Sequence, residues 1–222
     1  MREIIIDTET TGLDPADGHR IVELACIELH NYLPTGKVFH RYINPERAMT
    51  AEAEAVHGLG DDFLRRYEPF AAIAAEFVAF VGDAQIVAHN AGFDLGFINA
   101  ELKRLDLPPF AGPVVDTLEM ARKRFPGAPA SLDALCRRFE IDSSARDKHG
   151  AKLDCELLAK VYLELVGGRQ SALDLGAQAV KAASRAASER PARAPRPYAP
   201  SADELAGHAA LVAKLKAPIW QN

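Results

Sequence analysis

The stretch from Ile4 to Leu13 constrains this chain more than any other. The three isoleucines at its start predict a buried strand, because β-branched side chains suit a pleated sheet. Asp7 and Glu9 follow directly, and residues two apart in a strand project from the same face. The pair forms either the acidic, solvated end of a strand or half of a divalent metal site, since hard cations take carboxylate oxygens. The choice depends on whether the rest of the chain supplies more ligands.

Strand patterns dominate the first 45 residues, and strands and helices alternate afterwards. Turn residues separate the first three strands, which we expect to form an antiparallel meander. The expected strands are residues 3–8, 20–29, 36–43, 84–89 and 114–116. The expected helices are residues 52–57, 69–81, 94–105, 117–125, 132–139 and 153–166. This order predicts an α/β or α+β fold, with helices packed on a sheet.

Helical spacing also predicts which side chains face the core. In each of two expected helices, apolar residues recur every three or four positions and so form one apolar face. These faces contain Phe70, Ile73, Phe77 and Val81 in the first helix, and Leu95, Ile98, Leu102 and Leu105 in the second. Ser131 is expected to cap the helix that follows it.

Charge separates an acidic body from a basic tail. The formal net charge is −5, yet residues 181–222 carry 7 Lys and Arg against 3 Asp and Glu. An acidic body does not suit a protein that grips long duplex DNA by its phosphates, but it suits acids that hold metal ions. The three cysteines form no C-x-x-C pair, so we expect buried free thiols in a reducing cytoplasm. There is no signal-peptide pattern and no apolar run long enough to span a bilayer, so we expect no membrane association.

Composition divides the chain into three segments. Residues 1–175 hold every expected strand and core helix. Residues 176–200 are rich in Ala, Pro and Arg and predict a flexible linker. Residues 201–222 contain a short amphipathic helix, begun by a capping box of Ser201 and Glu204, and a tryptophan near the end. A linker, helix and tryptophan predict a docking segment, against the alternative of a tail without function.

Three later segments offer further acids or histidines. Residues 89–94 run from a strand end into a helix, where Asp94 is either a ligand or a helix-capping acid. His149 lies in a polar loop, and Asp154 lies in the first turn of the next helix. A lone loop histidine can also be an ordinary surface residue. Residues 52–57 form either a wall of a substrate site or a solvated helix face.

Together, Asp7-x-Glu9, His89-Asn90-x-x-x-Asp94 and His149-x-x-x-x-Asp154 resemble the DEDDh family of 3′–5′ exonucleases, in that family's order. The resemblance covers roughly residues 1–165. It implies a ribonuclease-H-like exonuclease fold, with a mixed five-stranded sheet flanked by helices and a flexible C-terminal tail.

The resemblance also implies two divalent metal ions, Mg²⁺ or Mn²⁺. Asp7, Glu9, Asp94 and Asp154 match the four ligand positions, and His149 matches the general base. Two such ions clamp a scissile phosphate, and a loop histidine can take a proton from the attacking water near neutral pH. We expect Asp7 to bridge both ions and Glu9 to face the nucleotide as well as metal.

The substrate implied by the resemblance is the single-stranded 3′ end of DNA. Residues around the first acidic pair are expected to cradle the terminal nucleotide, and the helix after the third strand is expected to touch it. The implied contacts are Thr8, Glu9, Thr10, Thr11, Glu52, His57 and Asn90. Asn90 is expected to support the site rather than react.

The tail resembles that of the proofreading (epsilon) subunits of bacterial DNA polymerase III. This implies that residues 201–222 bind the catalytic (alpha) subunit of the polymerase, in the cytoplasm at the replisome. Gln170, Leu173 and Leu175 resemble a sliding-clamp-binding peptide, and a plain transition from helix to linker is the alternative.

The expected function is therefore removal of mismatched 3′-terminal nucleotides from DNA. One alternative is a free-standing DNA or RNA 3′-exonuclease of the same fold. Another is a non-catalytic scaffold subunit of the replisome, against which the presence of all five matching residues argues.

Overall fold

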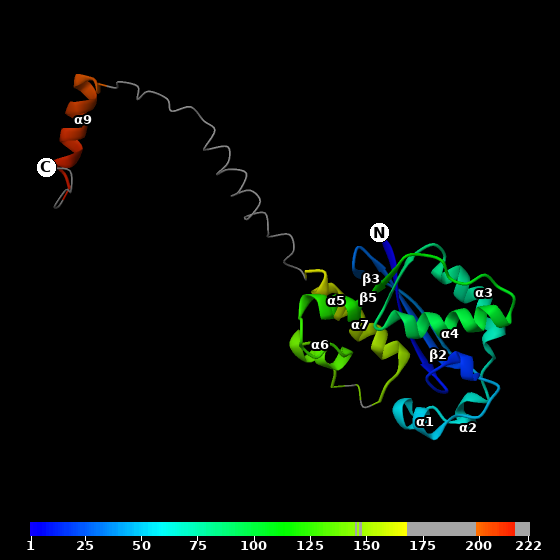
Figure 1. Ribbon diagram of the computed structural model, residues 1–222. Coiled ribbons are helices and arrows are strands. Elements are labelled where there is room, and N and C mark those ends of the chain that lie inside the picture. The colour runs from blue at the N-terminus through cyan, green and yellow to red at the C-terminus, as the bar shows by residue number, and fades with distance from the viewer. Residues whose placement is uncertain (145, 147, 168–198, 216–222) are drawn as a thin grey trace. The chain divides into compact units, whose positions relative to one another are not determined.

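The computed structural model describes residues 1–144, 146, 148–167 and 199–215 (Figure 1). A five-stranded sheet lies at the centre of the first of its two compact units, in the order β3-β2-β1-β4-β5. The strands are β1 (Arg2–Thr10), β2 (Ile21–His30), β3 (Leu33–Tyr42), β4 (Gln85–Ala88) and β5 (Val114–Asp116). The first three strands pair antiparallel, whereas β4 runs parallel to both β1 and β5. The predicted meander and mixed five-stranded sheet are confirmed.

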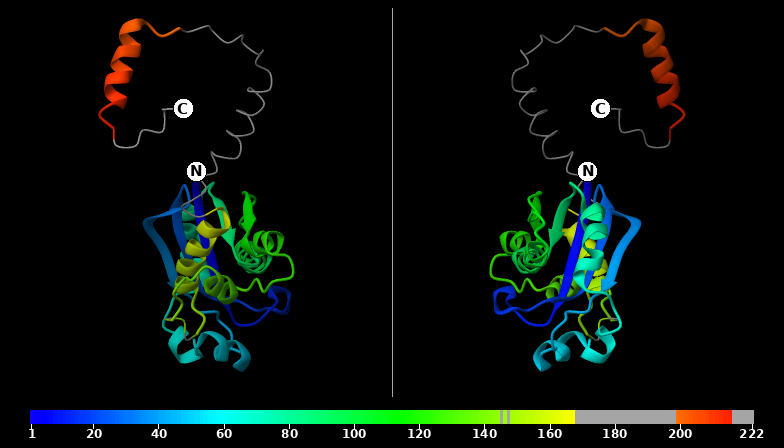
Figure 2. Two further views of the ribbon diagram at one scale, coloured as in Figure 1. Left: turned by 90° about the vertical axis from the view of Figure 1, so that its left-hand side faces the viewer. Right: turned by 90° about the vertical axis from the view of Figure 1, so that its right-hand side faces the viewer.

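Helices cover both faces of this sheet. They are α1 (Ala51–His57), α2 (Asp61–Leu64), α3 (Phe70–Val81), α4 (Ala91–Arg104), α5 (Thr117–Arg124), α6 (Leu132–Arg138) and α7 (Ala151–Leu165), with the short 3₁₀ helix η1 (Pro15–Asp17). Helices α3 and α4 lie on one face, and α5, α6 and α7 lie on the other (Figures 1 and 2). The sequence patterns did not predict η1 or α2, which are too short to show a period.

The alternation of side chains along β1 explains the two layers. Ile4 and Ile6 are fully buried among the apolar residues of α3 and α4. Ile5, which points the other way, is buried with those of α5, α6 and α7. A strand with both faces covered reads as a continuous apolar run, as this one does. The predicted inward faces of the helices over 69–81 and 94–105 are confirmed.

Two predicted boundaries were wrong. The strand expected at 36–43 begins at Leu33, because Asn31 and Tyr32 adopt left-handed backbone angles (φ 51° and 69°) and make a tight hairpin turn. The helix expected from Asp94 begins one turn earlier, at Ala91. Its first N–H groups donate to the carboxylate of Asp116, a residue that is remote in sequence.

The C-terminal segment forms a second unit, which contains the helix α9 (Ala202–Val212). The capping box predicted for Ser201 and Glu204 is confirmed, with hydrogen bonds in both directions. Leu205 and Leu211 are each more than half exposed. The expected clamp-binding residues lie outside the described part of the chain. No helix in the described ranges is long and apolar enough to cross a membrane.

Candidate active site

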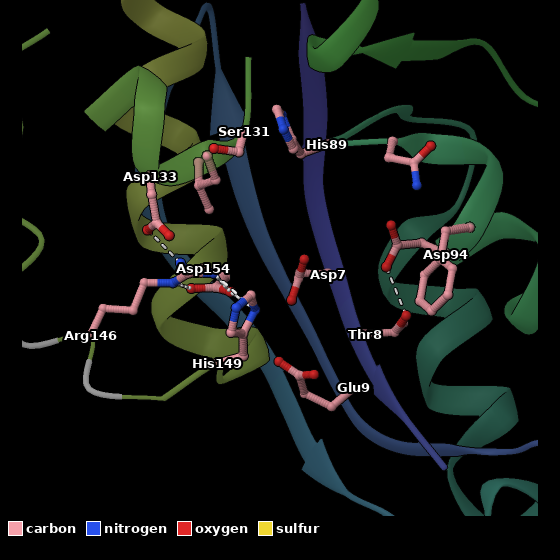
Figure 3. Close-up of a pocket in the computed structure, with 13 residues that line it drawn as sticks. Asp7, Thr8, Glu9, His89, Asp94, Ser131, Asp133, Arg146, His149 and Asp154 are labelled. Atoms are coloured by element: carbon pink, nitrogen blue, oxygen red, sulfur yellow. Dashed lines mark hydrogen bonds and ion pairs between the residues drawn. The ribbon is translucent and has the colours of Figure 1, made fainter. Parts of the chain in front are cut away.

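The acids of β1 lie at its C-terminal end, between α4 and α7 (Figure 3). Asp7 and Glu9 share the face of Ile5, which is the side of the sheet that α7 covers. Thr8 projects to the opposite side, toward α4, and its hydroxyl donates to Asp94 at 2.7 Å. The period of two in the strand thus directs the acids to one helix and the hydroxyl to the other.

These side chains line a cavity of about 330 Å³. Every predicted metal ligand and the predicted general base lie in its wall. Its lining residues are Asp7, Thr8, Glu9, His89, Asn90, Phe93, Asp94, Ser131, Leu132, Asp133, Arg146, His149 and Asp154. Residues separated by more than 140 positions in the sequence therefore meet in one place.

A hydrogen bond from Thr8 holds the Asp94 carboxylate at the cavity, and a different acid, Asp116, accepts from the N–H groups at the start of α4. Asp94 lies in the first turn of α4 and is buried, with its carboxylate bonded to Thr8. The N–H groups of Asn90 and Ala91 are taken by Asp116 instead. The alternative of Asp94 as a helix cap therefore does not describe this helix.

The sheet also fixes the start of α7, which carries Asp154. Gly150 offers this helix no side-chain cap, and Glu23 of β2 supplies one by accepting from the N–H of Ala151 at 3.2 Å. The other oxygen of Glu23 pairs with His40 Nε2 at 2.7 Å. Glu23 stands directly opposite Glu9 in the β1–β2 register, so the same strand pair positions both the acids and the helix.

Burial and mutual repulsion raise the pKa of three cavity acids. The pKa of Asp7 lies well above its ordinary value because of burial, followed by the charges of Asp94 and Glu9. Burial, with the charge of Asp154, raises the pKa of Glu9 to about 8. Burial also raises the pKa of Asp94 to about 7, although the bond from Thr8 opposes it. Acids crowded in this way favour protons or a shared cation.

The donor set fits a hard divalent cation. Ligand atoms of Glu9, His149 and Asp154 all lie within 4.8 Å of one another. Asp7 lies between Asp154 on one side and Asp94 on the other (Figure 3). Carboxylate oxygens grouped at this density are the ligands that Mg²⁺ and Mn²⁺ prefer. Any metal here would be held by the carboxylates of β1 together with those of α4 and α7.

Arg146 is a cavity residue that the sequence patterns missed. Its guanidinium forms a two-pronged ion pair with Asp154, with N–O distances of 2.5 and 2.6 Å. It also bonds to Asp133 of α6 and donates to Nδ1 of His149 at 3.0 Å. The one available signal was a basic residue in the same short loop as His149.

A second cavity of about 230 Å³ adjoins the first, and Thr8, Glu9 and Phe93 line both. Thr10, Glu52 and His57 also line it, so most of the predicted nucleotide contacts gather here. Phe93 was not predicted, although it precedes Asp94 in the first turn of α4 and lines both cavities. Leu13, which is 86% exposed, and Val56 complete an apolar rim.

Two of the predicted nucleotide contacts have little free polar surface. Thr11 is fully buried and lines neither cavity, and its hydroxyl is bonded to His19 and to the N–H of Arg20. His57 accepts from the N–H of Leu59 through Nδ1 and faces the carbonyl of Thr10 with Nε2. Burial lowers the pKa of His57, in keeping with a neutral ring that joins α1 to β1.

Known proteins are similar to this chain in sequence and in fold. The family model described as Exonuclease (RNase_T) matches residues 4–162. A DNA polymerase III subunit epsilon of Rickettsia conorii is 52% identical over 179 residues, covering 79% of this chain and 78% of the relative. The Escherichia coli K12 protein of that name is 46% identical over 178 residues, covering 77% and 73%.

Solved structures show the same fold at lower identity. The nuclease domain of 3′hExo, a DEDDh family member bound to rAMP, matches with a TM-score of 0.63 at 20% identity. That match covers 74% of this chain and 91% of the other. The zinc-bound complex of E. coli ExoI with single-stranded DNA matches with a TM-score of 0.67 at 22% identity, covering 78% and 42%.

Proposed function

This chain belongs to the RNase_T exonuclease family and is a homologue of the DNA polymerase III epsilon subunits, and from that premise we propose how it works. It is a 3′–5′ exonuclease that acts as the proofreading subunit of a bacterial polymerase III. We propose that it takes the single-stranded 3′ end of DNA and removes the terminal, mismatched nucleotide by hydrolysis. Its place of action in this proposal is the cytoplasm, at the replisome.

The observation that carries the proposal is the convergence of four carboxylates and one histidine in a single cavity. Asp7, Glu9, Asp94 and Asp154 come from three elements, and His149 comes from a loop. A fold does not fix a function, but this set of groups at one point suits phosphodiester hydrolysis.

Exonucleases of this family use divalent metals, and we propose two ions here, Mg²⁺ or Mn²⁺. The four carboxylates would hold them, with Asp7 as the shared ligand because it lies between the other acids. When bound, such ions supply the positive charge that stabilises the attacking and leaving oxygens of a phosphate.

The chain's own residues then perform distinct tasks. His149 accepts a proton from the attacking water, which a loop position next to the carboxylates allows. Thr8 fixes the carboxylate of Asp94 by its hydroxyl bond. Phe93 and the rim of the second cavity hold the base and sugar of the last nucleotide, with Glu52, Thr10 and the edge of His57 around it. Asn90 supports the first cavity.

We propose three functional segments along the chain. Residues 1–175 are the exonuclease domain, residues 176–200 are a linker, and residues 201–222 dock on the catalytic (alpha) subunit. The exposed Leu205 and Leu211 of α9 are apolar anchors for that partner. Gln170, Leu173 and Leu175 remain a proposed sliding-clamp contact.

A mismatched primer tests the enzymatic part of the proposal. Wild-type protein with Mg²⁺ should shorten a 5′-labelled DNA primer from its 3′ end, and Asp7→Ala should abolish shortening. An RNA primer run in parallel separates proofreading from RNA trimming. Undiminished Mg²⁺-dependent shortening by Asp7→Ala would refute the assignment of the cavity.

A pull-down tests the docking part. Deletion of residues 201–222, or the pair Leu205→Asp and Leu211→Asp, should abolish copurification with the catalytic subunit but keep exonuclease activity. Asp203→Asn, on the same helix, is the matched control. A deletion variant that still copurifies would contradict the docking assignment and favour a free-standing exonuclease.

A further inference from the structure

Arg146 makes an ion pair that the proposed reaction leaves unexplained. Its side chain and that of Asp154 are only 7% and 5% exposed. The guanidinium spans both carboxylate oxygens of Asp154. A planar fork on a carboxylate is among the strongest charge-assisted contacts in proteins. The carboxylate it occupies is one that the proposed function assigns to metal.

We propose that Arg146 is an internal cation that competes with divalent metal for Asp154 and then binds the phosphate of the nucleotide. The inference rests on the proposed function for the identity of the metal ligands. The guanidinium places one N–H on each carboxylate oxygen of Asp154, so a divalent ion bound to the same carboxylate would lie close to a second cation and share its acceptor oxygens. Repulsion between the two cations would therefore weaken the arginine ion pair and favour release of Arg146 when metal binds.

Release of Arg146 also frees the proposed general base. One guanidinium nitrogen donates to Nδ1 of His149, so Nδ1 is an acceptor in this arrangement. In a neutral ring the proton then lies on Nε2, and neither nitrogen has a free lone pair. When Arg146 leaves, Nδ1 regains its lone pair and can accept a proton from water. Metal loading and activation of His149 thus depend on one side chain.

The phosphate is the natural new partner for the released guanidinium. Within the described part of the chain, Asp7, Glu9, Asp94, Asp133 and Asp154 line the cavity, and Arg146 is the one Lys or Arg among its lining residues. A phosphate entering this acidic cavity needs cations, and a guanidinium fork matches its oxygens. Asp133 keeps the arginine at the cavity edge, because it bonds a different guanidinium nitrogen from those that hold Asp154.

Metal binding without DNA tests the competition. Isothermal titration with Mn²⁺ should show about tenfold tighter binding for Arg146→Gln than for wild type, since one charge-assisted contact no longer opposes the ion. Lys148→Gln removes the same charge from the same loop without touching Asp154, and it should change binding less than about twofold. Arg146→Lys, which keeps the charge but loses the fork, should fall between. Unchanged or weaker Mn²⁺ binding by Arg146→Gln would overturn the competition.

Nucleotide binding tests the phosphate contact. With saturating Mn²⁺, wild type should bind thymidine 5′-monophosphate more tightly than thymidine. In Arg146→Gln the ratio of the two dissociation constants should be about tenfold smaller than in wild type. An undiminished preference for the monophosphate would overturn this half. Circular dichroism in EDTA shows whether each variant is folded, and Arg146→Lys replaces any variant that is not.

These outcomes are separable from failure of the proposed function. If Arg146→Gln tightens Mn²⁺ binding but wild type shortens no primer, the competition stands and the exonuclease assignment fails. If wild type shortens primers and Arg146→Gln binds Mn²⁺ as wild type does, the exonuclease assignment stands and the competition fails.

Discussion

Glu9→Gln should stabilise the metal-free protein while damaging the enzyme. Glu9 is 8% exposed and lies among Asp7, Asp94 and Asp154, and its pKa is raised from 4.5 to about 8. A carboxyl group whose pKa is higher in the folded state than in the unfolded state lowers the free energy of unfolding once it ionises. For Glu9 this destabilisation is absent below pH 4.5 and grows as the pH rises toward 8.

The magnitude follows from the two pKa values. The raised pKa destabilises the folded state by about 1.4 kcal/mol for each pH unit above 4.5, which amounts to about 4 kcal/mol at pH 7.5 without any discount. Relaxation of the neighbouring acids and access of water reduce this, so we expect about 2 kcal/mol. For a chain of this size that free energy raises the melting temperature by about 4–8 °C.

Thermal melting in EDTA measures the effect. Glu9→Gln should melt above wild type at pH 7.5, and the gap should nearly close at pH 5. Glu68→Gln, at an exposed site on the same domain, is the matched control and should change little. Added Mn²⁺ should stabilise wild type more than Glu9→Gln. A variant no more stable than wild type at pH 7.5 in EDTA would refute the electrostatic account of the cavity.

Three further predictions concern single residues. His149→Ala should lower kcat by about 10²–10⁴-fold yet retain most of the melting-point rise caused by Mn²⁺, and a near-normal kcat would exclude it as the base. Phe93→Ala should raise KM more than it lowers kcat, and an unchanged KM would remove Phe93 from the nucleotide site. Hydrogen bonding from Arg2 lowers the pKa of Glu28 to about 2, so its stabilisation is present above pH 4.5 and is lost as the pH falls toward 2. Glu28→Gln should therefore cost about 1 kcal/mol in urea melts at pH 6 and almost nothing near pH 2, and an equal cost at both would refute the linkage.

The fold was predictable where local pattern and tertiary packing agree. Ile4–Ile6 form a continuous apolar run and the apolar face of α3 repeats about every 3.6 residues, and the structure buries both sets. The start of α4 was not predictable, because Asp116 creates it from a strand that is distant in sequence. The hairpin at Asn31 and Tyr32 lacks the glycine that usually marks such a turn.

The candidate site divides in the same way. Asp7 and Glu9 were visible because a strand places alternate residues on one face, and family order supplied Asp94, His149 and Asp154. Arg146 was not visible in the sequence, because a basic residue in a polar loop belongs to no periodic pattern. Its partner Asp154 lies on the next helix. Glu23 was hidden for a similar reason, since it caps α7 from across the sheet.

We infer that Asp7, Glu9, Asp94 and Asp154 hold two catalytic metal ions. Anomalous diffraction from crystals soaked with Mn²⁺ and thymidine 5′-monophosphate tests it most directly. We expect two peaks in the 330 Å³ cavity, about 3.5–4 Å apart, with Asp7 in contact with both. Peaks that lie elsewhere, or ions that Asp7 does not touch, would contradict it.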